Sequence, residues 1–278
     1  MLIQAQNYET LVHALQKEEP QLIQLLKHTP PAEPLVDHLL LYSRLCNISS
    51  FALLESYKVV KEAFEPFQDS DSIISLQGTS APFLYLRGDH SLLDKPIITI
   101  TGTKRPSIEA LMNLQQSIIH LSKHHVIALS GIDSGVERSV HTISAKISHP
   151  SIAVIRTSLS EVKESSSHIP LIVSPFSYVR KTQASFIPIA NTLKGRLSEA
   201  TCIIEAFDGE ASVKQVHYAL EQQKQVLLFE HTAHSRSLMW PRKLTPKELV
   251  STIKKGNEIY KKVFVTPIEV DKRQLTLF

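Results

Sequence analysis

The sequence predicts an α/β protein with a mainly parallel sheet, preceded by a small helical module. Two observations support this prediction. Before about residue 80, apolar residues recur at helical spacing, whereas from residue 96 onward short apolar runs alternate with helical segments. The runs are PIITITG (96–102), VIALSG (126–131), SIAVI (151–155), PLIVS (170–174), TCIIEAF (201–207) and QVLLF (225–229).

The first 80 residues contain four amphipathic stretches: YETLVHALQK, PQLIQLLK, PLVDHLLLYSRL and SSFALLESYKVVKEAF. Pro20 and the Pro30–Pro31 pair separate them, because proline interrupts a helix. Ser49 and Ser50 are suitable residues to cap the last of these helices. We therefore expect residues 1–80 to form a helical N-terminal module.

The apolar runs beyond residue 96 are continuous rather than alternating, which is typical of strands that are buried on both faces of a sheet. The segments IEALMNLQQSIIHLSK and VERSVHTISAKI follow the first two runs and have helical periodicity. A parallel sheet of this kind binds its ligand beyond the carboxyl ends of its strands. Glycine and serine residues lie at those ends in this sequence.

The composition is that of an ordinary soluble protein of 278 residues, with 42% hydrophobic and 21% charged residues. Neither a secretory signal nor an apolar run long enough to span a membrane is present, so we expect a cytoplasmic protein without membrane contact. Cys46 and Cys202 are far apart and without CxxC spacing, which suits a reducing compartment. From Arg236 to Phe278 there are ten Lys and Arg against four Asp and Glu; this basic segment either contacts phosphate or is a solvated lysine-rich surface.

Two strand ends have the residues of an anion site. TGTKRPS (101–107) places a glycine, a hydroxyl and two cations between a strand and a helix. SGIDSGVERSVH (130–141) repeats the arrangement with Ser130, Gly131 and Gly135. Backbone N–H groups at such junctions attract anions, so the pair favours phosphate or nucleotide binding, although a strand–glycine–helix junction also occurs merely to make the turn.

The usual enzymatic fingerprints are missing. The sequence has no GxGxxG, no GxxxxGK[ST] and no GxSxG. His120, His124 and His125 have no acidic or cysteine partner nearby, so we expect neither a metal site nor a cofactor. Glu205, at the end of a predicted strand, remains open between a catalytic carboxylate, a ribose-binding group and a helix-cap partner.

Taken in order, these pieces resemble the DNA-processing protein A (DprA, also called Smf) family of bacteria, as a diverged member. FLYLRGDHSLLDKPIITITGTKRPS resembles the family's YxRG…IAIVGSRxxS, and IALSGIDSGVERSVH resembles VVSGLAxGIDxxAH. PLIVSPF is similar to G-LISE-P, IPIANTLKGRLSEATCIIEA to FPxRNRIIAGLSxxVVVEA, and ALEQQKQVLLF to ALExGRxVFAVPG. The resemblance runs from about Phe83 to Phe229 and more loosely to about Val263.

The resemblance implies an extended Rossmann-like domain over residues 81–265, after the helical module and before a tail of residues 266–278. It further implies a non-catalytic protein that binds single-stranded DNA and helps deliver it to the RecA recombinase during natural transformation; we also expect a homodimer. Tyr178 and Phe186 are candidates for stacking on bases, although core packing is the more frequent role for Phe186. The implied DNA- or phosphate-binding residues are Gly102, Thr103, Lys104, Arg105, Ser130, Gly131, Gly135, Arg180, Lys181, Asn191, Lys194 and Arg196.

The sequence also departs from the family pattern. The family's RNR is replaced by Ala190, Asn191 and Thr192, so two arginines that contact phosphate are absent. This loss leaves open a scaffold that acts through protein contacts. A nucleotide phosphoribohydrolase-like enzyme is a further alternative, but its PGGxGTxxE motif is missing from EAFDGEAS (205–212).

The chain ends in QLTLF, which resembles the QL[SD]LF peptide with which bacterial replication and repair proteins bind the DNA polymerase sliding clamp. Leu275, Leu277 and Phe278 would fill an apolar groove while Gln274 hydrogen-bonds at its rim. Two other interpretations are a final β-strand and a hydrophobic end that packs on the core.

Overall fold

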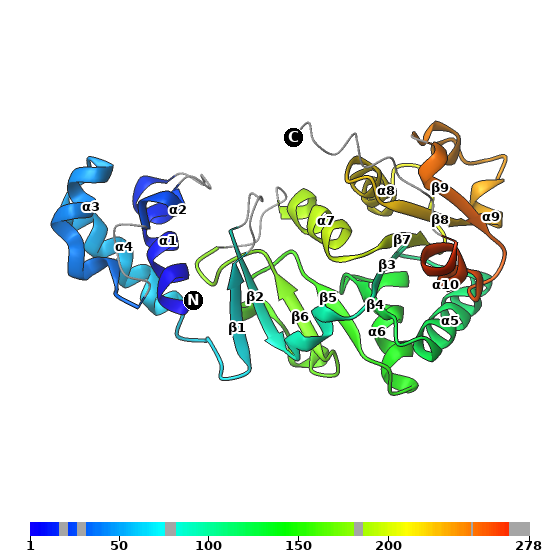
Figure 1. Cartoon of the computed structure of the whole chain (residues 1–278), viewed down its shortest axis with the longest axis horizontal. Helices are drawn as coiled ribbons and strands as arrows, with labels where there is room; N and C mark the ends of the chain where they lie inside the picture. Colours follow the sequence, from blue (N-terminus) through cyan, green and yellow to red (C-terminus); the bar gives the residue numbers. More distant parts are fainter. Residues whose placement is uncertain (17–21, 27–31, 76–81, 181–185, 246, 267–278) are drawn as a thin grey trace. The chain divides into compact units, whose positions relative to one another are not determined.

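The computed structural model describes residues 1–16, 22–26, 32–75, 82–180, 186–245 and 247–266 (Figure 1). The chain divides into two compact units. Unit 1 consists of Met1–Gly88, Ile155–Ser166 and Ile172–Ala190. Unit 2 consists of Asp89–Val154, Ser167–Leu171 and Asn191–Phe278. The domain boundaries that we placed near residues 80 and 265 stay a prediction.

Unit 1 begins with the helices that the sequence predicts. They are α1 (Leu2–Leu15), α2 (Leu22–Leu25), η2 (Leu35–His38), α3 (Leu39–Cys46) and α4 (Ser50–Ala63). Ser49 caps α4, because its hydroxyl oxygen accepts a hydrogen bond from the backbone N–H of Ala52 at 3.1 Å. Helices α1 and α4 pack against each other, and they bury Leu11, Leu53 and Val60 completely.

Unit 1 also contains an antiparallel pair of strands, β1 (Asp71–Ser75) and β2 (Phe83–Gly88), in which Asp71 is paired with Arg87. Beside β2 lies β6 (Leu171–Ser174), of which Ile172–Ser174 belong to this unit. Two short 3₁₀ turns, η4 (Leu159–Glu161) and η5 (Glu164–Ser166), complete the unit. Residues 71–75 fall within the segment that we expected to be helical; this part of the expectation is wrong, because the segment hydrogen-bonds to β2 along its length.

In the part of unit 2 that the structure describes, six parallel strands form the sheet. They are β3 (Ile97–Thr101), β4 (Ile127–Ser130), β5 (Ser151–Val154), β7 (Ala200–Ile203), β8 (Gln225–Phe229) and β9 (Val250–Ile253). Their order in the sheet is β5-β4-β3-β7-β8-β9, and each strand runs parallel to its neighbours in this order. β3, β4, β5 and β8 lie within the apolar runs named above, and β7 begins one residue before its run, which confirms a mainly parallel α/β fold. β9 was not predicted as a strand.

Helices cover both faces of this sheet because the side chains of each strand alternate between the faces. Cys202 packs with α5 (Ile108–Lys123), α6 (Val136–Lys146) and α10 (Glu258–Tyr260), whereas its neighbour Ile203 packs with α8 (Ala211–Glu221). The remaining elements are η3 (His90–Asp94), α7 (Phe186–Leu197), α9 (Glu230–Ala233), η6 (Trp240–Lys243), η7 (Lys247–Leu249) and the π-helical turn η8 (Lys261–Val265).

The order of the strands reverses at β3. From β3 the chain proceeds outward through β4 to β5, and it later returns to the other side of β3 as β7, β8 and β9. This is the doubly wound order of a Rossmann-type sheet, in which ligands bind outside the carboxyl ends of the strands where the direction changes. The site is therefore expected where β3 and β7 end side by side.

Candidate functional site

The carboxyl ends of β3 and β7 are held together at Gly102. A Cβ atom at Gly102 would lie 2.7 Å from Val136 Cγ2 and 2.8 Å from the carbonyl oxygen of Glu205, so no larger residue fits without a shift. The next residue, Thr103, donates its backbone N–H to the Glu205 carbonyl at 2.7 Å and its hydroxyl to Glu210 Oε1 at 2.6 Å. The loop after β3 is therefore fixed by contacts on both sides.

Two cations lie on this fixed loop. Lys104 and Arg105 are both exposed, and neither forms an ion pair with a residue that the structure describes. The helix that follows is capped by Ser107, whose hydroxyl oxygen accepts from the N–H of Ala110 at 3.1 Å. The N–H of Ser107 itself donates to Glu205 Oε2 at 2.8 Å, so Glu205 acts as the helix-cap partner among the three roles left open above.

The end of β4 packs tightly on its surroundings. Ser130 is buried, and its hydroxyl donates to the carbonyl of Ile100 at 2.6 Å. A Cβ atom at Gly131 would lie 2.3 Å from Glu137 Oε2, and the Gly131 carbonyl accepts from His141 Nε2 at 2.9 Å. Ser130 thus holds β4 to β3, and Gly131 leaves room for the Glu137 carboxylate.

Gly135 joins the two strand ends. Its φ of 73° and ψ of −133° belong to a region that side-chain-bearing residues rarely adopt. A Cβ atom there would lie 2.3 Å from the carbonyl oxygen of Thr103 and 2.5 Å from the backbone of Lys104. The N–H of Val136 donates to the same Thr103 carbonyl at 3.1 Å. The loops after β3 and β4 therefore form one packed surface.

A buried ion pair lies beneath this surface. Lys194 Nζ is 2.9 Å from Glu137 Oε1, and the two side chains are 7% and 15% exposed. Burial acts to raise the pKa of Glu137, but the charge and hydrogen bond of Lys194 outweigh it, so the pKa of this carboxyl lies below its ordinary value. The hydroxyl of Thr101 also donates to Glu137 Oε1, at 3.4 Å. Lys194 therefore favours the ionised form of the Glu137 carboxyl and compensates for its burial.

His141 is a buried neutral group beside this pair. Burial lowers its pKa to about 4. Because a carbonyl can only accept, Nε2 carries the proton that it donates to Gly131, and Nδ1 accepts from the Ser151 hydroxyl at 2.9 Å. The ring ties α6 to the first residue of β5 and to the residue that follows β4. Its contacts are those of a structural residue.

The other predicted site residues lie in different places. Asn191 is buried, and its carbonyl accepts from Gln215 Nε2 at 3.1 Å, whereas Arg196 is exposed on the same helix. Arg180 belongs to unit 1, where its Nη2 lies 3.3 Å from Glu9 Oε1. Within unit 2, the structure therefore brings together the predicted residues from Gly102 to Arg105 with Ser130, Gly131, Gly135 and Lys194. Their role in DNA binding stays a prediction.

Several predictions fall outside the described residues. Lys181 and the tail residues Gln274, Leu275, Leu277 and Phe278 are among them, and so is the side chain of Phe186.

Sequence reasoning missed Glu210 and the pairing of Glu137 with Lys194. Glu210 accepts from Thr103 and, through Oε2, from the backbone N–H of Phe207 at 2.9 Å. It is the N-cap residue of α8, and an acidic residue directly before a helical pattern is the signal that could have identified it. The pairing of Glu137 with Lys194 joins residues 57 positions apart and leaves no local signal.

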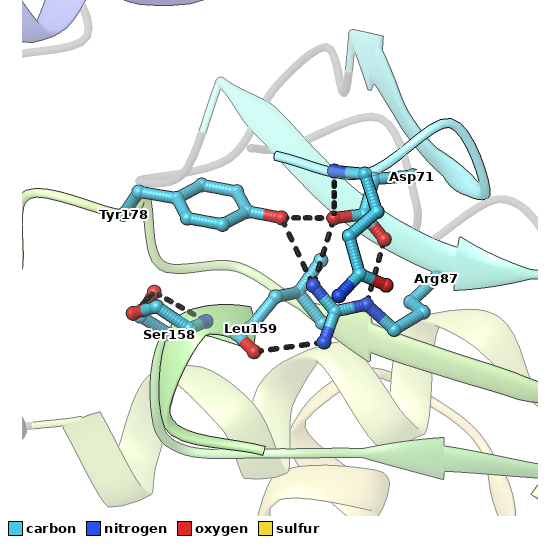
Figure 2. Close-up of polar contacts among 7 residues, drawn as sticks. Asp71, Arg87, Ser158, Leu159 and Tyr178 are labelled. Atoms are coloured by element: carbon cyan, nitrogen blue, oxygen red, sulfur yellow. Dashed lines mark hydrogen bonds and ion pairs between the residues drawn. The ribbon is translucent and has the colours of Figure 1, made fainter. Parts of the chain in front are cut away.

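A second polar cluster lies within unit 1 (Figure 2). Arg87, from the stretch that resembles YxRG, binds the two oxygens of Asp71 through Nε at 2.7 Å and Nη2 at 2.8 Å. Its Nη1 donates to the carbonyl of Leu159 at 3.2 Å, and the hydroxyl of Tyr178 donates to Asp71 Oδ2. Burial acts to raise the pKa of Asp71, but the hydrogen bonds from Arg87 and Tyr178 outweigh it and lower the pKa.

This cluster joins distant parts of unit 1 and uses Tyr178 as a core residue. The Tyr178 side chain is buried and packs against Phe64, Phe67 and Tyr85, with ring centroids 5.2, 5.9 and 6.1 Å away. The suggestion that Tyr178 stacks on bases is therefore wrong, because neither face of the ring is open while this packing persists.

Among the residues that the structure describes, no three His, Cys, Asp or Glu side chains form a group able to hold a metal ion. In the same part of the chain, no helix has both the length and the apolar character needed to cross a bilayer.

The strand order and the glycine-lined junctions define this chain as a Rossmann-type α/β protein. Residues 72–264, more than half of the chain, match the sequence model of the family described as DNA recombination-mediator protein A. The chain belongs to this family, as the sequence motifs predicted.

Individual relatives agree with this assignment. Over 157 residues the chain is 27% identical to the DNA processing protein DprA of Bacillus subtilis (strain 168), a match that covers 51% of each chain. The chain thus spans about half the length of that curated relative.

Two solved structures share the fold. DprA from Streptococcus pneumoniae is 14% identical with a TM-score of 0.65, covering 96% of this chain and 95% of that chain. DNA processing protein A from Helicobacter pylori, whose structure concerns its single-stranded DNA binding mode, is 20% identical with a TM-score of 0.59, covering 68% and 93%.

Proposed function

We propose that this chain binds single-stranded DNA without sequence preference and acts in DNA processing. The observation that carries the proposal is the position of Lys104 and Arg105: both are exposed, on a loop that Glu205 and Glu210 hold rigid at the point where the strand order reverses. Exposed cations on a fixed backbone neutralise phosphates and leave bases unread. Family membership and the DNA-binding relative from Helicobacter pylori support the proposal.

The proposed action is binding rather than catalysis. Glu205 is hydrogen-bonded to a helix N-terminus, and Glu137 is paired with Lys194. Carboxylates engaged in this way are poorly placed to transfer protons, and the phosphoribohydrolase alternative gains no support from them. The free thiols of Cys46 and Cys202 suit the cytoplasmic location that we also propose.

Fluorescence anisotropy with an unstructured oligonucleotide at several salt concentrations tests DNA binding. We expect affinity to fall steeply with salt, because binding releases counterions. Replacing Lys104 and Arg105 by alanine removes two phosphate contacts and should reduce the slope of log K against log salt by about 1.4.

The matched control is Lys123→Ala with Lys146→Ala. These exposed lysines lie at the carboxyl ends of α5 and α6, which lead back to the amino-terminal edge of the sheet. The control removes the same charge and should leave the slope nearly unchanged. An absence of binding at low salt, or equal effects of the two double variants, would contradict the proposal.

We further propose that the bound DNA is delivered to the RecA recombinase during natural transformation and that the chain acts as a homodimer. Co-precipitation with RecA in the presence and absence of oligonucleotide tests the first point. Light scattering after size exclusion, over a range of concentrations, tests the second. A monomer at all concentrations would refute the dimer without affecting the DNA proposal.

We propose that the tail contacts the DNA polymerase sliding clamp through Gln274, Leu275, Leu277 and Phe278. Deleting residues 274–278 should abolish clamp binding and leave oligonucleotide affinity and thermal stability unchanged. A large loss of stability would favour a tail that packs on the core.

One observation favours a second candidate, a scaffold acting through protein contacts. Two of the cations predicted to bind phosphate are engaged elsewhere, Lys194 with Glu137 and Arg180 with Glu9. A flat oligonucleotide titration together with a positive clamp interaction would select the scaffold.

A further inference from the structure

The chain makes a tight turn over residues Phe207–Glu210, separated by three residues from the end of β7. The N–H of Glu210 donates to the carbonyl of Phe207 at 3.2 Å, and Gly209 has a φ of 83°, as a type II turn requires at its third residue. The Glu210 carboxylate returns to accept the N–H of Phe207 at 2.9 Å. Both backbone groups of Phe207 are therefore fixed by Glu210.

The side chain on this fixed backbone is exposed. Phe207 is 47% exposed, although phenylalanine is among the residues most often buried. Among the described residues only one other phenylalanine, Phe51 in unit 1, is counted as exposed. An exposed phenyl ring on a hydrogen-bonded backbone, near the edge of a doubly wound sheet where ligands bind, is placed to contact something apolar and flat.

Hydrogen bonds connect both sides of this turn to segments that carry cations. On one side, Glu210 also accepts the hydroxyl of Thr103, the residue directly before Lys104 and Arg105. On the other side, Asp208 accepts the backbone N–H groups of Met239 at 3.0 Å and Trp240 at 2.9 Å.

Asp208 holds the segment 236–243 through Met239 and Trp240, and this segment is basic. The indole N–H of Trp240 donates to the carbonyl of Ala206 at 3.2 Å, which fastens the segment a second time. It carries three exposed cations, Arg236, Arg242 and Lys243, and Arg242 Nη2 donates to the carbonyl of Arg236 at 3.2 Å. The turn that presents Phe207 is thus attached to two basic segments by separate carboxylates.

We propose that Phe207 stacks on a base of single-stranded nucleic acid. The phosphates that flank this base are neutralised by Lys104 and Arg105 on one side and by Arg236, Arg242 and Lys243 on the other. A stacking aromatic between cations is the arrangement that binds single strands without reading sequence, since every base offers a flat face. This inference rests on the proposed binding of single-stranded DNA and adds a contact outside the motifs that carry the family resemblance.

The test compares two oligonucleotides of equal length, one of thymidines and one abasic, by anisotropy. Phe207→Ala should weaken binding to the thymidine strand by about 5- to 150-fold, the range measured for loss of base stacking. It should leave binding to the abasic strand unchanged, because that strand keeps its phosphates and has no base. Phe51→Ala, the same change at the other exposed phenylalanine, should affect neither strand.

A second variant tests the same contact through tryptophan fluorescence instead of through a change in affinity. The chain has a single tryptophan, and Trp240 is 5% exposed. Phe207→Trp keeps a stacking surface and adds an exposed indole, so its emission should be quenched by the thymidine strand and not by the abasic strand. Thermal unfolding of each variant should match that of the parent, because an exposed side chain contributes little to the core.

The outcomes separate the two proposals. If the parent chain binds neither strand, DNA binding and the stacking contact are both refuted. If the parent binds and Phe207→Ala loses the same factor on both strands, or loses nothing, the stacking contact alone is refuted. A clamp or recombinase interaction that is lost in Phe207→Ala while thymidine binding persists would also overturn it and assign the ring to a protein partner.

Discussion

Lys194 Nζ lies 2.9 Å from Glu137 Oε1, and this contact joins α7 to the first turn of α6 beneath the loops of the candidate site. Removing one member leaves the other as an unpaired buried charge. We therefore expect Glu137→Gln to reduce the free energy of unfolding by about 3 kcal/mol or more, measured by urea denaturation. The double variant Glu137→Gln with Lys194→Met should recover much of this loss. Equal stabilities for the single and double variants would contradict the assignment.

The same pair should make the free energy of unfolding fall at acid pH. The folded-state pKa of Glu137 lies below its ordinary value, so the pair stabilises the fold above that ordinary value. The stabilisation is lost as the pH falls through the lowered pKa.

His141 should make the free energy of unfolding depend on pH in a range higher than that of Glu137. Its pKa is about 4 in the folded chain and about 6.5 when unfolded, so between these values the unfolded state binds more protons. The free energy of unfolding should fall as the pH drops from about 6.5 towards 4. His141→Gln, which can still donate to Gly131, should be less stable at pH 7 and should lose most of this slope. An unchanged slope in urea titrations at several pH values would refute the assignment.

Gly135 and Gly209 allow the cost of a positive φ alone to be compared with the cost of a positive φ together with a steric clash. Both have positive φ, 73° and 83°, but a Cβ atom meets the Thr103 carbonyl at 2.3 Å at Gly135 and nothing within 4 Å at Gly209. Gly209→Ala should cost about 1 kcal/mol, the penalty of a left-handed backbone. Gly135→Ala should cost more and should also weaken oligonucleotide binding, because Lys104 must move. Equal costs in thermal unfolding would show that the junction relaxes.

The cluster of Asp71, Arg87 and Tyr178 predicts graded losses of stability. Tyr178→Phe removes one hydrogen bond to a carboxylate and should cost about 1 to 2 kcal/mol. Arg87→Met leaves the fully buried Asp71 carboxylate without its cation and should cost about 3 kcal/mol or more. Circular dichroism during urea unfolding measures both. A larger loss for Tyr178→Phe than for Arg87→Met would contradict the roles derived from the contacts.

Much of the sheet could be predicted because its strands are buried on both faces. Apolar runs such as QVLLF and the helix 108–123 are local patterns, and the structure has them where the sequence indicates. β9 was missed because it lies at the edge of the sheet, where its first three residues are half-buried and no continuous apolar run is needed. β1 was missed because its strand geometry depends on pairing with β2.

The site was predictable only in part. The glycines and cations at the strand ends follow from the topology of parallel sheets. The contacts that decide which cations face solvent do not, because Lys194 and Glu137 are 57 positions apart and Thr103 and Glu210 are 107 apart. Phe207 was passed over because exposure is a property of the folded chain.

The discontinuous make-up of unit 1 has a consequence for synthesis on the ribosome. Arg87 and Asp71 leave the exit tunnel long before Tyr178, which follows them by 91 and 107 positions. Between them the ribosome makes Asp89–Val154, which belongs to unit 2. The amino-terminal unit therefore cannot complete its buried network until much of the next unit has been translated, and an internal stop before residue 178 would release a chain in which that network is unfinished.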